Sequence, residues 1–161
     1  MLLKEILCIL EGDARQTPKQ IAVMTGTSEE EVAGLIRQAE EDGTIIKYRA
    51  LVDWEKTGDS YVWALIEVKV APQRTVGFDA IAECIYRFDE ARTVYLMSGA
   101  YELAVLVSAK SMREVADFVT QKLAAIEGVT GTTSHFLLKR YKEDGVILTG
   151  GAGASRQAVV L

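Results

Sequence analysis

The chain has 161 residues, of which 49% are hydrophobic and 25% charged, and its formal net charge is −5 at pH 7. This balance is ordinary for a folded globular protein and too apolar for a disordered one, and the length accommodates one large or two small domains. No apolar run reaches the roughly 18 residues that a membrane span requires, and Lys4 and Glu5 interrupt the apolar start. We therefore expect no membrane anchor and no signal peptide, and a cytoplasmic location.

Cysteine and histidine are scarce. Cys8 and Cys84 lie among apolar residues at helical spacing, so we expect small buried side chains rather than a disulfide or a metal pair. The sole histidine, His135, lies in an apolar stretch and is expected to be a packed strand residue rather than a catalytic group. The sequence contains no glycine-rich phosphate loop and no Cys/His cluster of metal-ligand spacing, so we expect no metal and no cofactor.

Apolar residues recur at helical spacing three times in the first 40 residues, which predicts three short helices. The second and third helices begin at Thr17-Pro18-Lys19-Gln20 and Ser28-Glu29-Glu30-Glu31, which both fit a capping box. Gly26 falls between them, where a C-cap glycine permits a tight turn. This spacing is typical of a helix-turn-helix. The β-prone stretch Ile45 to Val52 follows and is expected to form a wing strand.

The second half begins with a change of period. Residues 61 to 70 alternate between apolar and mixed positions, which predicts a strand, and a helical stripe runs from Phe78 to Ile85. Two strands are expected at 93 to 97 and 101 to 108, joined by a hairpin at Ser98-Gly99-Ala100. A third capping box at Ser111-Met112-Arg113-Glu114 opens another helix, and a last strand is expected from Val129 to Tyr141. This order of elements is ferredoxin-like.

The sequence therefore predicts an α+β protein, with an N-terminal winged helix-turn-helix and a C-terminal ferredoxin-like βαββαβ sandwich domain. The expected parts are the head at 1–54, a hinge at 55–60, the βαββαβ domain at 61–148 and a flexible tail at 149–161. Both helices of the second domain would cover one face of its sheet. Apolar side chains of both parities, such as Trp63, Leu65, Phe136 and Leu137, indicate that the uncovered face meets another copy in a dimer or higher oligomer.

In this order, the two patterns resemble the Lrp/AsnC family of leucine-responsive and asparagine regulators, up to about Leu148. The resemblance lies in Ile21-Ala22, Thr27-Ser28 and Ile45-Ile46-Lys47-Tyr48 of the head, and in Ser98-Gly99-Ala100-Tyr101-Glu102 and Gly128-Val129-Thr130-Gly131-Thr132-Thr133 of the second domain. It implies a transcription factor that binds double-stranded DNA, assembles from dimers, and responds to an amino acid or a similar small metabolite. The chain departs from the family in having Gly34 and Leu35 where many relatives carry basic residues, and Glu102 where the hairpin usually has Asp.

The head is acidic, which is unusual for a DNA-binding unit. Residues 1–55 contain six basic and eleven acidic residues, so the whole net charge lies there. Carboxylates that face a DNA backbone are repelled, but Glu29, Glu30 and Glu31 occupy a first helical turn, where they favour the helix dipole. We expect weak binding per head, strengthened when several heads bind together, or else a head that has lost DNA binding in an assembly or metabolite-sensing protein. The candidate DNA contacts are Lys19, Gln20, Ser28, Arg37, Lys47 and Arg49.

The hairpin of the second domain and its last strand are the candidate effector site. An amino acid needs an acidic partner for its ammonium group, which Glu102 offers, and donors for its carboxylate, which hairpin amides and strand hydroxyls offer. The alternative is that these residues bind no effector. Gly99 would then serve only to form the turn, and the hydroxyl residues would be present only because they favour a strand. The candidate residues are Ser98, Gly99, Ala100, Tyr101, Glu102, Thr132, Thr133 and Ser134.

One class of enzymes, the sirohaem decarboxylases, resembles this chain in having the same layout of two domains. Those enzymes share a run of the Thr-His-Asn-Tyr type. The nearest segment of this chain, Thr133-Ser134-His135-Phe136, lacks the Asn and the Tyr. We therefore expect a regulator and not an enzyme.

Overall fold

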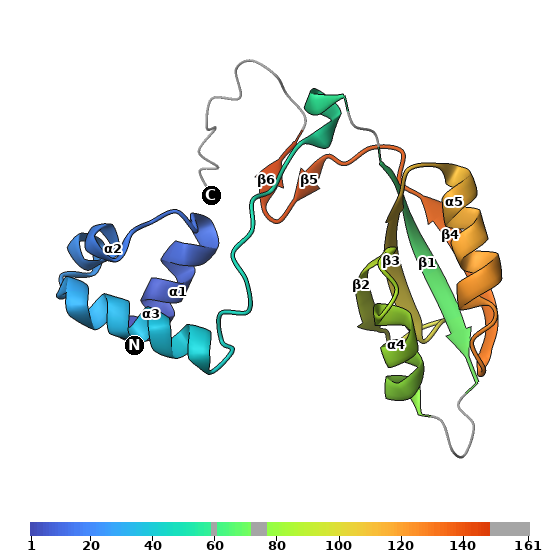
Figure 1. The fold of residues 1–161 in the computed structure, drawn as a ribbon, viewed down its shortest axis with the longest axis horizontal. Helices are drawn as coiled ribbons and strands as arrows, with labels where there is room; N and C mark the ends of the chain where they lie inside the picture. The colour runs from blue at the N-terminus through green and yellow to red at the C-terminus, as the bar shows by residue number, and fades with distance from the viewer. Residues whose placement is uncertain (59–60, 72–76, 149–161) are drawn as a thin grey trace, which may run out of the picture. The chain divides into compact units, whose positions relative to one another are not determined.

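The computed structural model describes residues 1–58, 61–71 and 77–148 (Figure 1). The chain divides into two compact units, Met1–Val52 and Asp53–Leu161, which we call the head unit and the sheet unit. The expected tail at 149–161 and residues 59 and 60 of the expected hinge lie outside the described residues. In the described ranges, no helix combines the length and hydrophobicity needed to cross a bilayer.

Three helices form the head unit, as the apolar spacing predicts. Ile6, Ile21 and Val32 are fully buried, so each helix contributes one side chain to the centre of a small apolar core. Gly26 ends the second helix with φ +70°, in the left-handed region that favours glycine, and the third helix starts three residues later. The helices are α1 (Leu2–Gly12), α2 (Pro18–Thr25) and α3 (Glu29–Glu41).

The expected wing strand at Ile45 to Val52 is wrong for this chain. Residues 46–53 belong to neither a helix nor a strand, and Ile46 is 92% exposed. A strand needs a neighbour for its N–H and C=O groups, and within the described residues no strand pairs with this segment. The Tyr48 hydroxyl instead donates a hydrogen bond to Glu40 Oε1 of α3, at 2.9 Å.

Of the three expected capping boxes, one is complete and two are half formed. At the helix α5 (Met112–Asp117), the Glu114 carboxylate accepts from the Lys110 amide instead of the Ser111 amide. Thr17 and Gln20 form a complete capping box at the start of α2. Ser28 accepts a hydrogen bond from the Glu31 amide, but the Glu31 carboxylate accepts from the Thr27 hydroxyl rather than from the Ser28 amide. The start of α3 is therefore fixed by a half-box and a contact to the preceding threonine.

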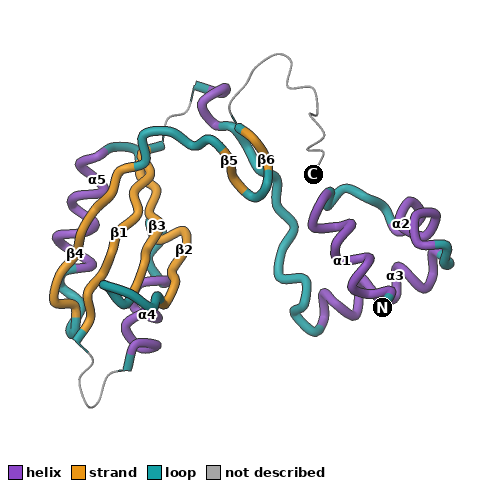
Figure 2. Tube along the Cα trace, turned by 180° about the vertical axis from the view of Figure 1, so that it is seen from behind, coloured by secondary structure: helices purple, strands orange, loops and turns teal. Residues whose placement is uncertain are grey.

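The sheet unit has a four-stranded antiparallel sheet in the order β2-β3-β1-β4, which confirms the ferredoxin-like arrangement (Figures 1 and 2). Its elements are the 3-10 turn η1 (Trp54–Thr57), β1 (Val62–Val70), α4 (Phe78–Tyr86), β2 (Ala91–Leu96), β3 (Leu103–Ala109), α5 (Met112–Asp117), the π-helical turn η2 (Phe118–Leu123), β4 (Val129–Phe136), β5 (Lys142–Glu143) and β6 (Val146–Ile147).

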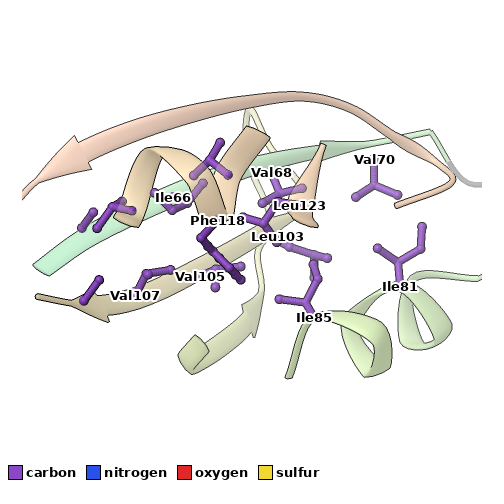
Figure 3. Packing of buried hydrophobic residues seen from close by; sticks show 14 residues of the cluster. Ile66, Val68, Val70, Ile81, Ile85, Leu103, Val105, Val107, Phe118 and Leu123 are labelled. Atoms are coloured by element: carbon purple, nitrogen blue, oxygen red, sulfur yellow. The ribbon is translucent and has the colours of Figure 1, made fainter. Parts of the chain in front are cut away.

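Helices α4 and α5, together with the turn η2, cover one face of this sheet. Ile66 and Val68 of β1 are fully buried, and they belong to a core that includes Ile85 of α4, Val115 of α5 and Leu123 of η2 (Figure 3). The helix predicted from 112 onward changes to π-helical winding at Phe118, and the Phe118 ring lies in the core. The other side chains of β1 point to the opposite face, which we call the open face.

Two expectations for the sheet unit and the head need correction. Cys8 and Cys84 are exposed rather than buried, because the buried positions Ile6, Leu10, Ile81 and Ile85 define helix faces from which both cysteines are turned away. The last strand ends at Phe136 instead of Tyr141 and is followed by a short β5–β6 hairpin.

Candidate DNA-binding surface and effector site

The candidate DNA contacts lie on the surface of the head unit, and all six side chains are exposed. Lys19 and Gln20 are in the first turn of α2, Ser28 is the N-cap of α3 and Arg37 is in the second half of α3. A helix-turn-helix presents its second helix to the major groove while its first helix crosses the backbone. Lys47 and Arg49 lie in the segment after α3, which forms no wing strand.

Two of these candidates already have a structural role. Gln20 Oε1 accepts hydrogen bonds from the Thr17 amide and hydroxyl, both at 2.8 Å. Ser28 Oγ accepts from the Glu31 amide at 3.2 Å. Their capping oxygens are thus committed to holding α2 and α3.

Several carboxylates of the head unit are held in local contacts. Glu31 and Glu40 accept hydrogen bonds from the hydroxyls of Thr27 and Tyr48. Burial of the Tyr48 ring, together with the nearby Glu40, raises the pKa of that phenol. The Asp42 carboxylate accepts a hydrogen bond from the Thr44 amide at 2.8 Å, and hydrogen bonding to Thr44 lowers the pKa of Asp42. These contacts fix part of the negative charge at the ends of α3.

The hairpin between β2 and β3 gives Glu102 a structural role that the sequence did not indicate. Its Oε2 accepts a hydrogen bond from the Val70 amide at 2.7 Å, and its own amide donates to Val68 O at 3.3 Å. The Glu102 carbonyl accepts from the Met97 amide at 2.8 Å, which closes the hairpin. Glu102 therefore holds the end of β1, where the register with β4 shifts between Lys69 and Val70.

The structure does not bring all the effector candidates together within one chain. Thr132 and Ser134 pair with Val68 and Ile66, whose side chains enter the core, whereas Thr133 pairs with Glu67 on the open face. Strand alternation thus divides the three hydroxyls between two faces. Since β1 lies between β3 and β4, the rows of Glu102 and Thr132 are two strand spacings, or about 10 Å, apart.

Two polar contacts on or beside the open face were not foreseen from the sequence. His135 Nε2 lies 3.1 Å from Glu67 Oε1, and the histidine is exposed rather than packed, because β4 is an edge strand. Arg140 stacks on the Trp63 ring, with its guanidinium carbon 5.5 Å from the ring centroid, and donates a hydrogen bond to Glu143 at 2.7 Å. No short motif predicts the His135–Glu67 or the Arg140–Trp63 contact, since each joins residues far apart in the sequence.

The β5–β6 hairpin did have a sequence signal. Asp144 and Gly145 form its two-residue turn, with φ of +46° and +80°. An Asp-Gly pair between two β-prone stretches is the typical sequence of such a turn. The strand expected from Val129 ends at Tyr141, before this turn, and the expected elements include no hairpin after it.

A helix-turn-helix joined to a ferredoxin-like sheet unit defines a class of two-unit transcriptional regulators, and the comparisons with known proteins agree. The sequence profile of the Lrp/AsnC ligand binding domain matches residues 63–147. The chain is 46% identical over 156 residues to the uncharacterised HTH-type transcriptional regulator YugG of Bacillus subtilis, covering 96% of this chain and 94% of that protein. The chain therefore belongs to the Lrp/AsnC family, and it is a transcriptional regulator that binds DNA through its helical head and responds to a small effector.

Solved structures support the same fold. Escherichia coli AsnC superposes with a TM-score of 0.70 at 20% identity, covering 88% of this chain and 93% of AsnC. A Neisseria meningitidis transcriptional regulator, solved as a complex with L-Met, superposes with a TM-score of 0.73 at 21% identity, covering 88% of this chain and 91% of that one. At these identities the likeness establishes the arrangement of the elements, and the names of the sequence relatives favour regulation over decarboxylation.

Proposed function

We propose that this protein is a cytoplasmic, amino-acid-responsive regulator that acts as a dimer or higher oligomer built through the open face of its sheet unit. The observation that carries this proposal is the open face itself. Trp63, Leu65 and Leu106 of β1 and β3 are only half-buried there, because both helical layers lie on the opposite side (Figure 2). Apolar side chains of this size on a broad face favour burial against a protein partner.

A second copy of the chain is the occupant that best fits this face. Its charged residues on β1, Glu67 and Lys69, are of opposite sign, so two such faces do not repel each other strongly. A face that is central to the sheet can also meet its own copy across a two-fold axis, which is the commonest geometry for homo-oligomers. Tyr95 of β2, which is 59% exposed, extends the apolar surface toward one edge.

The proposed effector is an amino acid, bound near the β2–β3 hairpin. One Glu102 oxygen is committed to the Val70 amide, and the other remains for an ammonium group. The hairpin amides at Gly99 and Ala100 are exposed and are candidate donors for a carboxylate. Of the three hydroxyl residues of β4, Thr133 lies on the open face and could join this site through the hairpin of a second subunit, whereas Thr132 and Ser134 lie on the core side and could contribute only at the edge of the sheet.

The proposed DNA surface is thin and depends on having more than one head. Lys19, Arg37, Lys47 and Arg49 supply its positive charge, while Gln20 and Ser28 position the helices. Each head alone would bind weakly because its net charge is negative. Linking two heads through the sheet units raises the effective concentration of the second head and so the overall affinity.

The test combines assembly, DNA and effector measurements on the full-length protein. Light scattering at micromolar concentration should give at least a dimer, and Leu106→Glu on the open face should give a monomer, while Ala80→Glu on the exposed side of α4 should not. Fluorescence anisotropy on the gene's own upstream DNA, with and without a pool of the twenty amino acids, should show binding that the pool alters. A wild-type monomer would overturn the assembly, and an unaltered DNA affinity would overturn the effector.

A further inference from the structure

The open face carries a contact between a histidine and a carboxylate, His135 and Glu67. His135 of β4 and Glu67 of β1 are diagonal neighbours, since His135 pairs with Leu65 and Glu67 pairs with Thr133. Their side chains contact each other, with Nε2 and Oε1 3.1 Å apart, and are 53% and 28% exposed. His135 is the sole histidine of the chain, and imidazole is the side chain whose charge ordinarily depends on pH near neutrality.

The surroundings of this pair are mostly groups that do not titrate near neutral pH. Across β1, the open-face residues of β3 are Ala104, Leu106 and Ser108, which carry no charge. Lys69 shares the open face with Glu67, but its side chain extends over Gly131 toward the edge of the sheet. Arg140 lies at the other end, on the Trp63 ring, and is paired with Glu143. His135 is therefore the charged group in contact with Glu67, and Lys69 and Glu102 are the other charged groups at this end of the face.

Protonation of His135 decides whether Glu67 is compensated when the open face is covered. With a protonated imidazole, the two side chains form a hydrogen-bonded ion pair. This pair has no net charge, so burying it in an interface leaves no uncompensated charge. With a neutral imidazole, Glu67 is an uncompensated carboxylate beside Leu65 and Leu106, and removing it from water costs free energy. Burial of this face thus favours proton uptake by His135, and proton uptake favours burial.

We propose that the His135–Glu67 pair makes self-association of this protein pH-dependent, so that the assembly tightens as the pH falls from 8 to 6. This inference rests on the proposed dimer through the open face. A symmetric dimer buries two such pairs, so each association event is coupled to the uptake of up to two protons. If every dimer took up two protons over this whole range, the dissociation constant would change by up to about a hundredfold per pH unit. We expect a total change of about tenfold, because only part of this proton uptake is linked to association.

The experiment measures the dissociation constant of the full-length protein by sedimentation equilibrium from pH 5.5 to 8.5 at fixed salt. The wild type should show a constant about tenfold larger at pH 8 than at pH 6. His135→Gln should remove this dependence and leave the weaker association. Glu67→Gln should also abolish the tightening at low pH, because a protonated His135 then has no carboxylate to compensate it. The control Glu83→Gln, in the exposed Arg87 pair of α4, should keep the wild-type dependence.

The outcomes separate the two proposals. A wild type that is monomeric at every pH overturns the dimer, and the inference with it. A wild type that dimerises with the same constant at every pH leaves the dimer standing and overturns the role of His135. A pH dependence that persists in His135→Gln also overturns it, since the proton would then bind elsewhere. Circular dichroism of each variant at both pH limits verifies that it is folded.

Discussion

Replacement of Glu102 separates the two roles of this side chain, one in the sheet and one in effector binding. Glu102→Ala leaves the Val70 amide without its acceptor at 2.7 Å, at a half-buried position. A hydrogen bond to a charged group contributes roughly 1.5–3 kcal/mol, and we expect the free energy of unfolding to fall by about that amount. Glu102→Gln keeps an acceptor oxygen but loses the charge, so its unfolding free energy should fall by only about 1 kcal/mol.

Urea unfolding followed by circular dichroism measures both costs, and calorimetric titration with each of the twenty amino acids measures effector binding. If Glu102 binds the ammonium group, Glu102→Gln should weaken the effector about tenfold to a hundredfold while remaining folded. Glu83→Ala, on the exposed side of α4, provides a carboxylate control. Unfolding of Glu102→Ala at the wild-type urea concentration would refute the structural role. Wild-type effector affinity in Glu102→Gln would refute the binding role.

Three further predictions concern other parts of the chain. Arg37→Glu should weaken DNA binding at low salt about tenfold and reduce its salt dependence, as measured by anisotropy; unchanged affinity would remove Arg37 from the DNA surface. Gly128→Ala should lower the unfolding free energy by about 1–3 kcal/mol, because φ is +93° and the new Cβ would lie 2.8 Å from Ile81 Cδ1; an unchanged urea midpoint would contradict this. The hydrogen bond from Lys122 lowers the pKa of Glu90 below its ordinary value, so the pair stabilises the fold above about pH 4.5 and loses this effect as the pH falls through the lowered pKa. The stability deficit of Glu90→Gln at pH 7 should therefore shrink as the pH falls below about 4.5, and a deficit that stays constant over the acid range would rule this out.

Local sequence signals were sufficient for most of the fold. The alternation of β1, the capping box at Thr17 and the C-cap glycine at Gly26 depend on neighbours within four residues, and each is present as expected. The two layers of the sheet unit follow from the order of these elements, because antiparallel βαββαβ chains place both helices on one face.

Contacts between distant residues could not be predicted in this way. The acceptor role of Glu102 toward Val70 depends on the end of β1, and the His135–Glu67 contact depends on the register of β1 and β4. The stretch from Ile45 to Val52 has the composition of a strand, but composition does not supply a pairing partner. For the same reason the hydroxyls of β4 were grouped by their closeness in sequence, although alternation sends Thr133 to the face opposite Thr132.

The π-helical turn η2 also determines how the chain tolerates changes of length. An α-helix advances about 100° per residue, so one inserted residue would normally rotate everything after it away from the core. The wide turn absorbs one extra residue locally, which keeps Val115 and Leu123 on the same packed side. Deletion of Thr120, an exposed residue whose hydroxyl donates to Ala116 O, should therefore convert this segment to regular α-helical winding and leave Val115 and Leu123 packed on the sheet.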